Sequence, residues 1–352
     1  MTATVKHKFV SPKGDSADPT IVQPSNWNDD HTVTLDPLAG TRNKVINGLF
    51  NIWQRKTDFP SATGVRYSAD RWRLAGIGSQ IGLVGSNSNG LYSDMGVGGE
   101  LPIFSFTSVA GNNNNAFVDQ AIEGVHTLSG KQATLTFSAR RWSGTATKIG
   151  WQVFQYFGNG GSPSPIVVVA SGVETFTSTM KQVKNTFFVP SVEGKSFGTN
   201  GDNALYIRFY FDAGSTAQSF GTPAVGRQSG SMAFTKVSLV EGDATGEDDP
   251  FPKRHIQLEY ILCCRYYQRA RFSVRLRTST IANDYIAAHL NFPEMRAPPA
   301  LSVIYTGVMG NIQVGPSLWV AETNGVTIDM IATSANTDTY VLNRNYGLDA
   351  EY

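Results

Sequence analysis

The stretch that decides the fold is residues 43–74, NKVINGLFNIWQRKTDFPSATGVRYSADRWRL. Two phrases rich in aromatic and basic residues, 47–55 and 67–73, flank a polar segment that contains Pro60 and Gly64. Pro and Gly are typical of turns, so we interpret the two phrases as the first strands of a β-sandwich and the segment between them as a loop. The large aromatic side chains of these strands are predicted core residues: Phe50, Trp53 and Trp72. The stretch holds no apparent catalytic residue.

Composition indicates a globular protein whose polarity is mostly uncharged. The chain has 352 residues, of which 41% are hydrophobic, enough for two or three domains and a sizeable core. Charged residues make up 16%, below the roughly 25% of ordinary soluble domains. Asn, Ser, Thr, Gln and Gly supply the remaining polarity, which favours β-strands with long loops. A net charge of +1 argues against a nucleic-acid partner, because nucleic acid requires a basic surface.

Cysteine usage and hydropathy bear on where the protein is made. The two cysteines, Cys263 and Cys264, are adjacent, so we expect buried thiols in a helix and no disulfide. Residues 1–16 contain no apolar run of the kind a signal peptide has. No segment approaches the roughly 18 apolar residues of a membrane span. We therefore expect synthesis in a cytoplasm, no membrane insertion, and release by lysis or as part of a particle.

Residues 1–42 form a separate N-terminal segment. Turn-forming residues dominate it and bulky apolar residues are few, so it cannot bury a core of its own. We expect it to lie extended on a partner or on a neighbouring subunit, which makes it a candidate attachment segment.

Residues 43–243 have the pattern of an all-β domain. The clearest strand is 132–141, in which Ala133, Leu135 and Phe137 fall on one face and polar residues on the other. Similar runs recur, separated by Gly- and Asn-rich loops: 101–109, 149–157, 166–170, 183–189, 204–211 and 231–240. This number of short strands predicts a jelly-roll β-sandwich.

The composition changes after this domain. Residues 244–269 are predicted to be an acidic, Pro-containing linker followed by a helix over 255–269. The helix is apolar round much of its circumference, which makes it a candidate for a buried contact between subunits. Residues 270–352 are predicted to be a smaller C-terminal β-domain, with alternating runs at 271–277, 285–292, 300–305, 318–322 and 326–331.

The order of these phrases resembles a family of tailed-bacteriophage or prophage tail fibres and receptor-binding adhesins that contain a carbohydrate-binding-module-like jelly roll. The resemblance rests on 47–55, 67–72, 128–137, 237–268 and 348–352, and residues 8–9, 24–28 and 31 are similar to the attachment segment of such proteins, so it covers nearly the whole chain. Residues 246–249 and the second cysteine depart from the family pattern. The motifs are structural and not catalytic.

The resemblance implies a virion structural protein, most simply a tail fibre subunit. Such a protein would attach to other virion proteins through residues 1–42, bind a host cell-surface polysaccharide and form a homotrimer. A capsid-attached head fibre or decoration protein is one alternative, and a polysaccharide depolymerase is another.

Enzyme signatures are weak in this sequence. Residues 194–198, GKSFG, match G-x-S-x-G, but a nucleophile elbow requires a following helix, and the residues after 198 cannot form one. Glycosidases use two carboxylates across a cleft. Asp119, Glu123, Asp202 and Asp212 are candidates that the sequence cannot pair, and we interpret them as loop and edge charges. We therefore predict that the protein is not an enzyme.

Ligand binding is the chemistry that the sequence favours. Aromatic rings stack on the C–H faces of sugars, and planar polar side chains bind the hydroxyl groups. The candidate ligand-binding residues are Tyr92, Trp142, Tyr285, Trp319 and Tyr340, and core packing is the alternative for each. No cofactor is expected. A structural Ca²⁺ would take oxygen ligands from Asp243, Glu247, Asp248 and Asp249, although a solvated acidic linker is the favoured interpretation of these residues.

Overall fold

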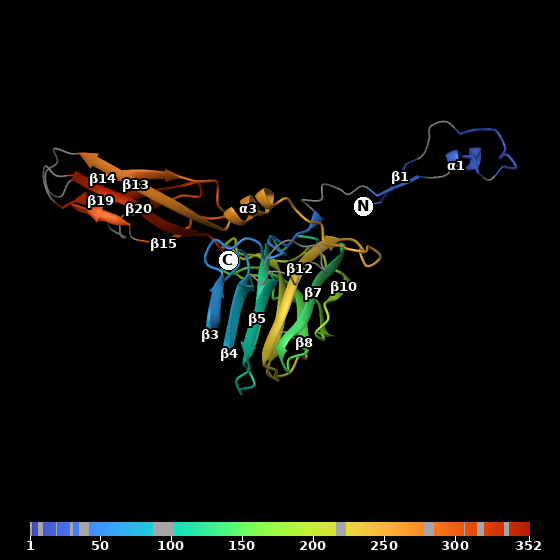
Figure 1. The fold of residues 1–352 in the computed structure, drawn as a ribbon, viewed down its shortest axis with the longest axis horizontal. Helices are drawn as coiled ribbons and strands as arrows, with labels where there is room; N and C mark the ends of the chain where they lie inside the picture. The colour runs from blue at the N-terminus through green and yellow to red at the C-terminus, as the bar shows by residue number, and fades with distance from the viewer. Residues whose placement is uncertain are drawn as a thin grey trace.

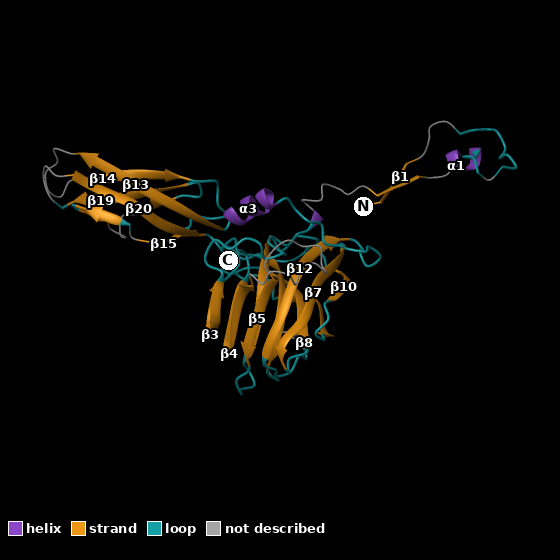
Figure 2. Cartoon of the chain, viewed as in Figure 1, coloured by secondary structure: helices purple, strands orange, loops and turns teal. Residues whose placement is uncertain are grey.

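The structure is a computed structural model that describes residues 2–5, 10–18, 20–28, 31–34, 42–86, 101–215, 223–277, 285–305, 307–314, 320–333 and 338–352. Strands dominate it (Figure 2), as the sequence predicts. The helices described are α1 (Pro24–Asn28) and α3 (Ile256–Cys264). Neither is long and apolar enough to cross a membrane.

The large domain is a β-sandwich. Its strands are β3 (Asp58–Tyr67), β4 (Arg73–Ser86), β5 (Leu101–Thr107), β6 (Asn115–Glu123), β7 (Gln132–Gly144), β8 (Lys148–Tyr156), β9 (Val167–Thr175), β10 (Lys181–Phe188), β11 (Ala204–Ala213) and β12 (Gly230–Glu241). They pair in the order β10-β7-β12-β5-β4-β6-β11-β8-β9, with β3 beside β4. Figure 1 shows β3, β4, β5, β12, β7 and β10 side by side in one layer, with β8 behind them.

Strand β4 joins the two layers of the sandwich. Its first half pairs with β6 from Arg73 onward, and its second half pairs with β5 up to Ser86. The change of partner falls at a bulge between Ile77 and Gly78. Gly78 has φ +69°, which glycine adopts without strain, so the chain can bend there. One layer is therefore β10-β7-β12-β5, and the other is β6-β11-β8-β9.

The core between the two layers is rich in phenylalanine. The buried rings of Phe50, Trp72, Phe104, Phe137, Phe209 and Phe234 contact one another. The rings of Phe50 and Trp72 stack with centroids 4.7 Å apart, and both side chains are fully buried, as predicted. Trp53 is partly buried and packs against the same cluster.

The opening stretch is not built as predicted. Residues 47–55 form an irregular loop and 68–72 form a turn, whereas the segment with Pro60 and Gly64 is strand β3. Asn47 and Phe50 have φ of 56° and 57°, values that no strand tolerates. The Asn47 side chain replaces strand pairing by bonding four backbone groups: its Nδ2 donates to Ile52 O and Asp70 O, and its Oδ1 accepts from the amides of Asn51 and Ile52.

Hydrogen bonds join the loop and the turn into one unit, the Asn47–Asp70 unit, which comprises residues 47–54 and 68–72. The Asp70 amide donates to Ile52 O (3.0 Å), and Trp72 Nε1 donates to Asn47 O (2.9 Å). The Asp70 carboxylate accepts from the backbone amide of Gln54 (3.0 Å) and from its Nε2 (2.6 Å). The two aromatic-basic phrases are therefore close in space because they form one hydrogen-bonded unit, whose Phe50 and Trp72 side chains are buried in the core.

Helix α3 is shorter than predicted. It ends at Cys264, and residues 267–269, which we expected to be helical, belong to strand β13 (Tyr267–Arg277). The Tyr266 ring packs on Arg71 of the large domain, 3.4 Å from the guanidinium carbon to the ring centroid, and Tyr267 pairs with Asp349. These contacts favour an extended chain over another helical turn. Both thiols are free and buried, as predicted.

The C-terminal domain is a small sandwich of two four-stranded sheets. Besides β13, its strands are β14 (Tyr285–Asn291), β15 (Ala300–Tyr305), β16 (Val308–Gly310), β17 (Ile312–Val314), β18 (Val320–Ala321), β19 (Gly325–Ala332) and β20 (Asp338–Asp349). One sheet is centred on β20 and the other on β19. Side chains from both centres, among them Ile328, Met330, Val341 and Leu348, fill the core between them.

The N-terminal segment has little structure beyond β1 (Thr2–Val5), α1 and β2 (His31–Thr34). Strands β1 and β2 pair with each other. The loop between them is tied by hydrogen bonds between Ser11 and Asn28 (2.7 and 3.0 Å). Figure 1 shows β1 and α1 apart from the sandwich.

Candidate functional site

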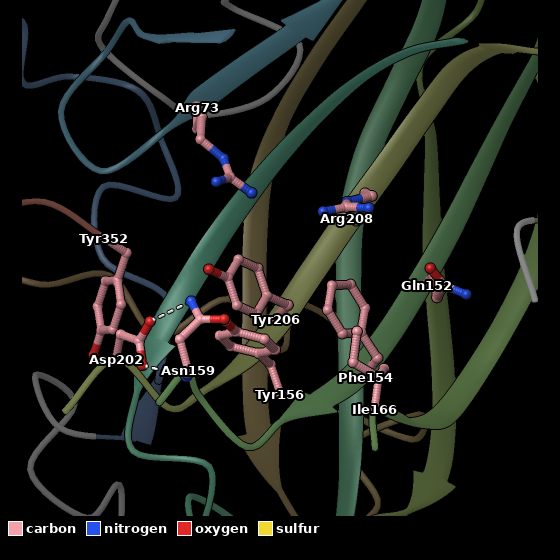
Figure 3. A pocket seen from close by; sticks show the side chains of 10 residues that line it. All are labelled: Arg73, Gln152, Phe154, Tyr156, Asn159, Ile166, Asp202, Tyr206, Arg208 and Tyr352. Atoms are coloured by element: carbon pink, nitrogen blue, oxygen red, sulfur yellow. Dashed lines mark hydrogen bonds between the residues drawn. The ribbon is translucent and has the colours of Figure 1, made fainter. Parts of the chain in front are cut away.

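A cavity of about 370 Å³ opens on the face of the β6-β11-β8-β9 layer that points away from the core. Its walls combine aromatic rings with charged and amide side chains (Figure 3), and the lining residues are Arg73, Gln152, Phe154, Tyr156, Asn159, Ile166, Asp202, Tyr206, Arg208 and Tyr352. Alternation along the strands builds this face. On β11, Ile207 and Phe209 enter the core, whereas Tyr206 and Arg208 face the cavity.

A row of polar residues crosses the floor of the cavity. Arg73 on β4 pairs in register with Asp119 on β6, Asp119 pairs with Arg208 on β11, and Arg208 pairs with Gln152 on β8. Directly opposed residues in antiparallel strands lie within side-chain contact of each other. The register of four strands therefore assembles this row from residues that are far apart in the sequence.

Asp119 is the centre of the row and is fully buried. Arg73 donates to it through Nε and Nη2 (both 2.8 Å), and Arg208 donates through Nε (3.0 Å) and Nη2 (2.7 Å). Burial opposes ionisation of this carboxyl group, but the charges of Arg208 and Arg73 and their hydrogen bonds outweigh it and hold the pKa of Asp119 below its ordinary value. Asp119 therefore stays ionised and fixes both guanidinium groups.

Aromatic rings form the wall next to this row. Phe154 and Tyr206 stack with centroids 5.0 Å apart and an interplanar angle of 1°, and Tyr156 meets Tyr206 edge-on at 5.9 Å. Small residues lie next to Tyr206, since it pairs with Ala121, and Ala204 pairs with Tyr156. Phe154 and Tyr206 are almost buried, and Tyr156 is only half-buried. Tyr156 therefore offers more ring surface to a ligand than its two neighbours.

The far end of the chain supplies another part of the wall. Tyr352 lines the cavity, and its ring lies 4.1 Å from the guanidinium carbon of Arg296. The Tyr67 hydroxyl donates to Tyr352 O (3.0 Å). The Tyr352 hydroxyl is buried without a hydrogen-bond partner among the described residues, and burial, with nearby charges, raises its pKa.

The rim opposite the polar row is made by Asp202 and Asn159. Asp202 accepts hydrogen bonds from the backbone amide and from Nδ2 of Asn159, both at 2.8 Å (Figure 3). The preceding residue, Gly158, has φ +91°, and a Cβ there would lie 2.8 Å from Asp202 Oδ1. A side chain at 158 would therefore disturb this rim.

The two predicted ligand-binding residues whose side chains the structure describes, Trp142 and Tyr340, do not line this cavity. Trp142 is 37% exposed near the end of β7, with Arg140 5.0 Å from its ring. Tyr340 is half-buried on β20 in the C-terminal domain. Tyr92 and Trp319 lie outside the described residues, as does the side chain of Tyr285 on β14.

Two of the four acidic residues do not match their predicted settings. Asp119 and Asp212 are fully buried on strands, and Asp212 accepts hydrogen bonds from Ser79 and Gln228. Both were interpreted as loop or edge charges, and that interpretation is wrong because they lie on inner strands β6 and β11 with buried partners. Glu123 is bound by Arg265 and Tyr266. Asp202 is a loop residue at the cavity rim.

The acidic linker does not fit a Ca²⁺ site. Asp243 accepts hydrogen bonds from Thr245 and Thr186, Glu247 pairs with Arg42, and Asp249 pairs with Lys236 (2.8 Å). These carboxylates are directed at different partners and not at one point. Within the part of the chain that the structure describes, no three His, Cys, Asp or Glu residues gather as metal ligands.

The sequence of this chain matches no protein-family model and no curated protein. Among solved structures, it matches the family 11 carbohydrate-binding module of Clostridium thermocellum in complex with a β-1,3-1,4-mixed-linked tetrasaccharide, with TM-score 0.30 and 16% identity over 52% of this chain and 99% of that chain.

Two further matches are of similar strength. The CBM22-2 xylan-binding domain of Paenibacillus barcinonensis Xyn10C has TM-score 0.30 and 16% identity, over 49% of this chain and 92% of that chain. The enzymatically active domain of bacteriophage CBA120 tailspike protein 4 has TM-score 0.33 and 15% identity, over 58% of this chain and only 22% of that chain.

Proposed function

We propose that this protein is a non-enzymatic glycan-binding protein and that the cavity on the β6-β11-β8-β9 layer holds a sugar. The observation that carries the proposal is the composition of the cavity wall, in which half-buried rings stand beside fixed planar polar groups. Sugars present both C–H faces and hydroxyl groups, so this combination suits them. The rings of Tyr156 and Tyr352 would take the C–H face, and Asn159 and Arg73 would bind polar groups of the sugar.

Rigidity supports this assignment. Most of the polar groups sit on paired strands. Asp119 fixes the guanidinium groups of Arg73 and Arg208. Asp202 fixes the Asn159 side chain. Little conformational freedom is then lost when a ligand binds.

We propose further that this glycan-binding protein is a tail fibre subunit of a bacteriophage. The support is the sequence resemblance, together with an N-terminal segment that stands apart from the sandwich (Figure 1) and exposes Val10, Ile21 and Val22. This segment would bind another virion protein. Immunogold labelling of particles tests the setting: labels at the tail support it, and labels on the head support a head fibre instead.

The homotrimer remains a prediction, with α3 as the contact between subunits. Ile256, Leu258, Tyr260 and Ile261 of this helix are 40–61% exposed in the single chain. Association of like subunits would remove this apolar surface from water. Size-exclusion chromatography with light scattering should give three times the chain mass, and a monomer would contradict the prediction.

Binding and turnover are tested together on the purified protein. Host-surface polysaccharides immobilised on an array should retain the protein, and prolonged incubation should leave their chain length unchanged. Shortened chains would make the protein a depolymerase. Among the described residues that line the cavity, Asp202 is the one with a carboxylate side chain, whereas glycosidases of the common type use two.

A further inference from the structure

The floor of the cavity carries unequal numbers of positive and negative charges. Arg73 and Arg208 are both cationic, and the one carboxylate between them, Asp119, is kept ionised by their charges. These three side chains together carry a charge of +1. The two guanidinium groups reach the surface of the cavity, with 22% and 20% of their side chains exposed, whereas Asp119 is fully buried.

One guanidinium nitrogen of the cavity-lining arginines has no hydrogen-bond partner among the described residues. Arg73 binds Asp119 through Nε and Nη2, and its Nη1 makes no hydrogen bond to any residue that the structure describes. Arg208 uses Nε and Nη2 for Asp119, and its Nη1 contacts the Tyr210 hydroxyl at 3.3 Å. A ligand anion would therefore meet a fixed N–H group of Arg73 and the exposed side of Arg208.

Asp202, the other charged side chain among the described residues that line the cavity, does not cancel this excess at the floor. Asp202 precedes Arg208 by six residues, which is roughly 20 Å along an extended chain, and both its oxygens already accept hydrogen bonds from Asn159. Figure 3 shows Asp202 and Asn159 on the far side of Tyr206 from the two arginines. Arg296, behind the Tyr352 ring, adds a further positive charge at that end.

We propose that the cavity selects an acidic glycan and places the carboxylate of a uronic-acid-type sugar against Arg73 and Arg208. This inference rests on the proposed glycan-binding function and narrows it to a ligand class. A neutral sugar would displace water from the exposed guanidinium groups without supplying a negative charge to balance them. One carboxylate balances the single excess charge and has the planar geometry that guanidinium groups bind.

A polysaccharide panel that holds acidic and neutral bacterial surface glycans tests the inference on the intact protein. We expect retention of uronate-containing polysaccharides. Reduction of their carboxyl groups to alcohols should weaken binding at least about tenfold, since a charge-assisted hydrogen bond is lost. Binding restricted to neutral or phosphorylated glycans, or equal binding of the reduced form, would overturn the acidic ligand class but leave glycan binding intact. No binding to any glycan would overturn the proposed function itself.

Variants and salt supply a second readout. Arg73→Gln should lose about tenfold or more in affinity for the acidic polysaccharide and should weaken the salt dependence of binding. Lys131→Gln, which removes one charge from an exposed pair with Glu241, should change neither. If Arg73→Gln fails to fold, the salt dependence of the intact protein remains decisive: affinity that does not fall with rising NaCl concentration contradicts an ionic contact.

Discussion

At the scale of single residues, Asp70 shows how the fold tunes one group. Its carboxylate is fully buried in the Asn47–Asp70 unit. Burial raises its pKa from 3.8 to about 6, although hydrogen bonds from Gln54 and the charge of Arg55 oppose the shift. A raised pKa means that the folded protein binds this proton more tightly than the unfolded chain does.

Asp70 therefore makes the protein less stable as pH rises. Between pH values of about 4 and 6, the folded state retains a proton that the unfolded chain has lost, so the free energy of unfolding falls with pH in this window. The full effect is on the order of 3 kcal/mol. Urea denaturation at several pH values should show the wild type losing this amount relative to Asp70→Asn. A difference between the two proteins that is constant or grows with pH would contradict the assignment.

Residue type predicted part of this picture. Phe50 and Trp72 are core residues as expected, because large aromatic side chains in a phrase with few charges are usually buried. The burial of Asp119 was not foreseen. Its strand β6 follows a run of asparagines, which indicates a loop, and the two arginines that stabilise its charge are 46 and 89 residues away in the sequence.

At the scale of elements, the Asn47 side chain stabilises the Asn47–Asp70 unit through four hydrogen bonds to the backbone. Asn47→Ala should lower the free energy of unfolding by about 2–4 kcal/mol, because the amides of Asn51 and Ile52 and the Asp70 carbonyl lose this partner, whereas Ile52 O keeps its bond from the Asp70 amide. The matched control is Asn51→Ala, four residues away, whose side chain makes no hydrogen bond to a described residue and should change stability by less than about 0.5 kcal/mol. Equal effects of the two substitutions in thermal or urea unfolding would show that the stability of the Asn47–Asp70 unit does not depend on the Asn47 side chain.

Strands with regular alternation were predicted well. The runs at 132–141 and 204–211 correspond to β7 and β11. The first strands were misplaced because aromatic enrichment was taken as strand propensity, whereas positive φ at Asn47, Phe50 and Arg71 excludes an extended chain there. Strand β20 was also missed, although it is central to its sheet.

At the scale of the whole molecule, an ion pair joins the two β-domains. Arg71 of the sandwich and Glu351 are 1% and 2% exposed and bind each other, and Arg55 binds Asp349 at 2.9 Å. Glu351→Gln would leave Arg71 buried without its counter-charge and should cost about 3–5 kcal/mol of unfolding free energy. Glu322→Gln, at an exposed position of the C-terminal domain, should cost less than about 0.5 kcal/mol. Similar losses of unfolding free energy in both variants would mean that the Arg71–Glu351 pair does not stabilise the protein.

The cavity exists only at this scale, which is why the sequence did not predict it. Its residues come from β4, β8, β11, two loops and the end of the chain. Their proximity follows from strand register, and a single sequence contains no register information for strands this far apart. Alternation in β8 and β11 was a usable signal: Gln152, Phe154 and Tyr156, with Tyr206 and Arg208, place rings and polar groups on the face opposite the core.

The most direct test of the account compares two aromatic residues on the same glycan. Calorimetric titration of the retained polysaccharide should show that Tyr156→Ala, in the cavity wall, loses about tenfold or more in affinity, since stacking on aromatic rings carries much of such binding. Trp142→Ala, at an exposed position outside the cavity, should bind as the wild type does. Loss of binding in Trp142→Ala with full binding in Tyr156→Ala would contradict the account and move the sugar site away from this cavity.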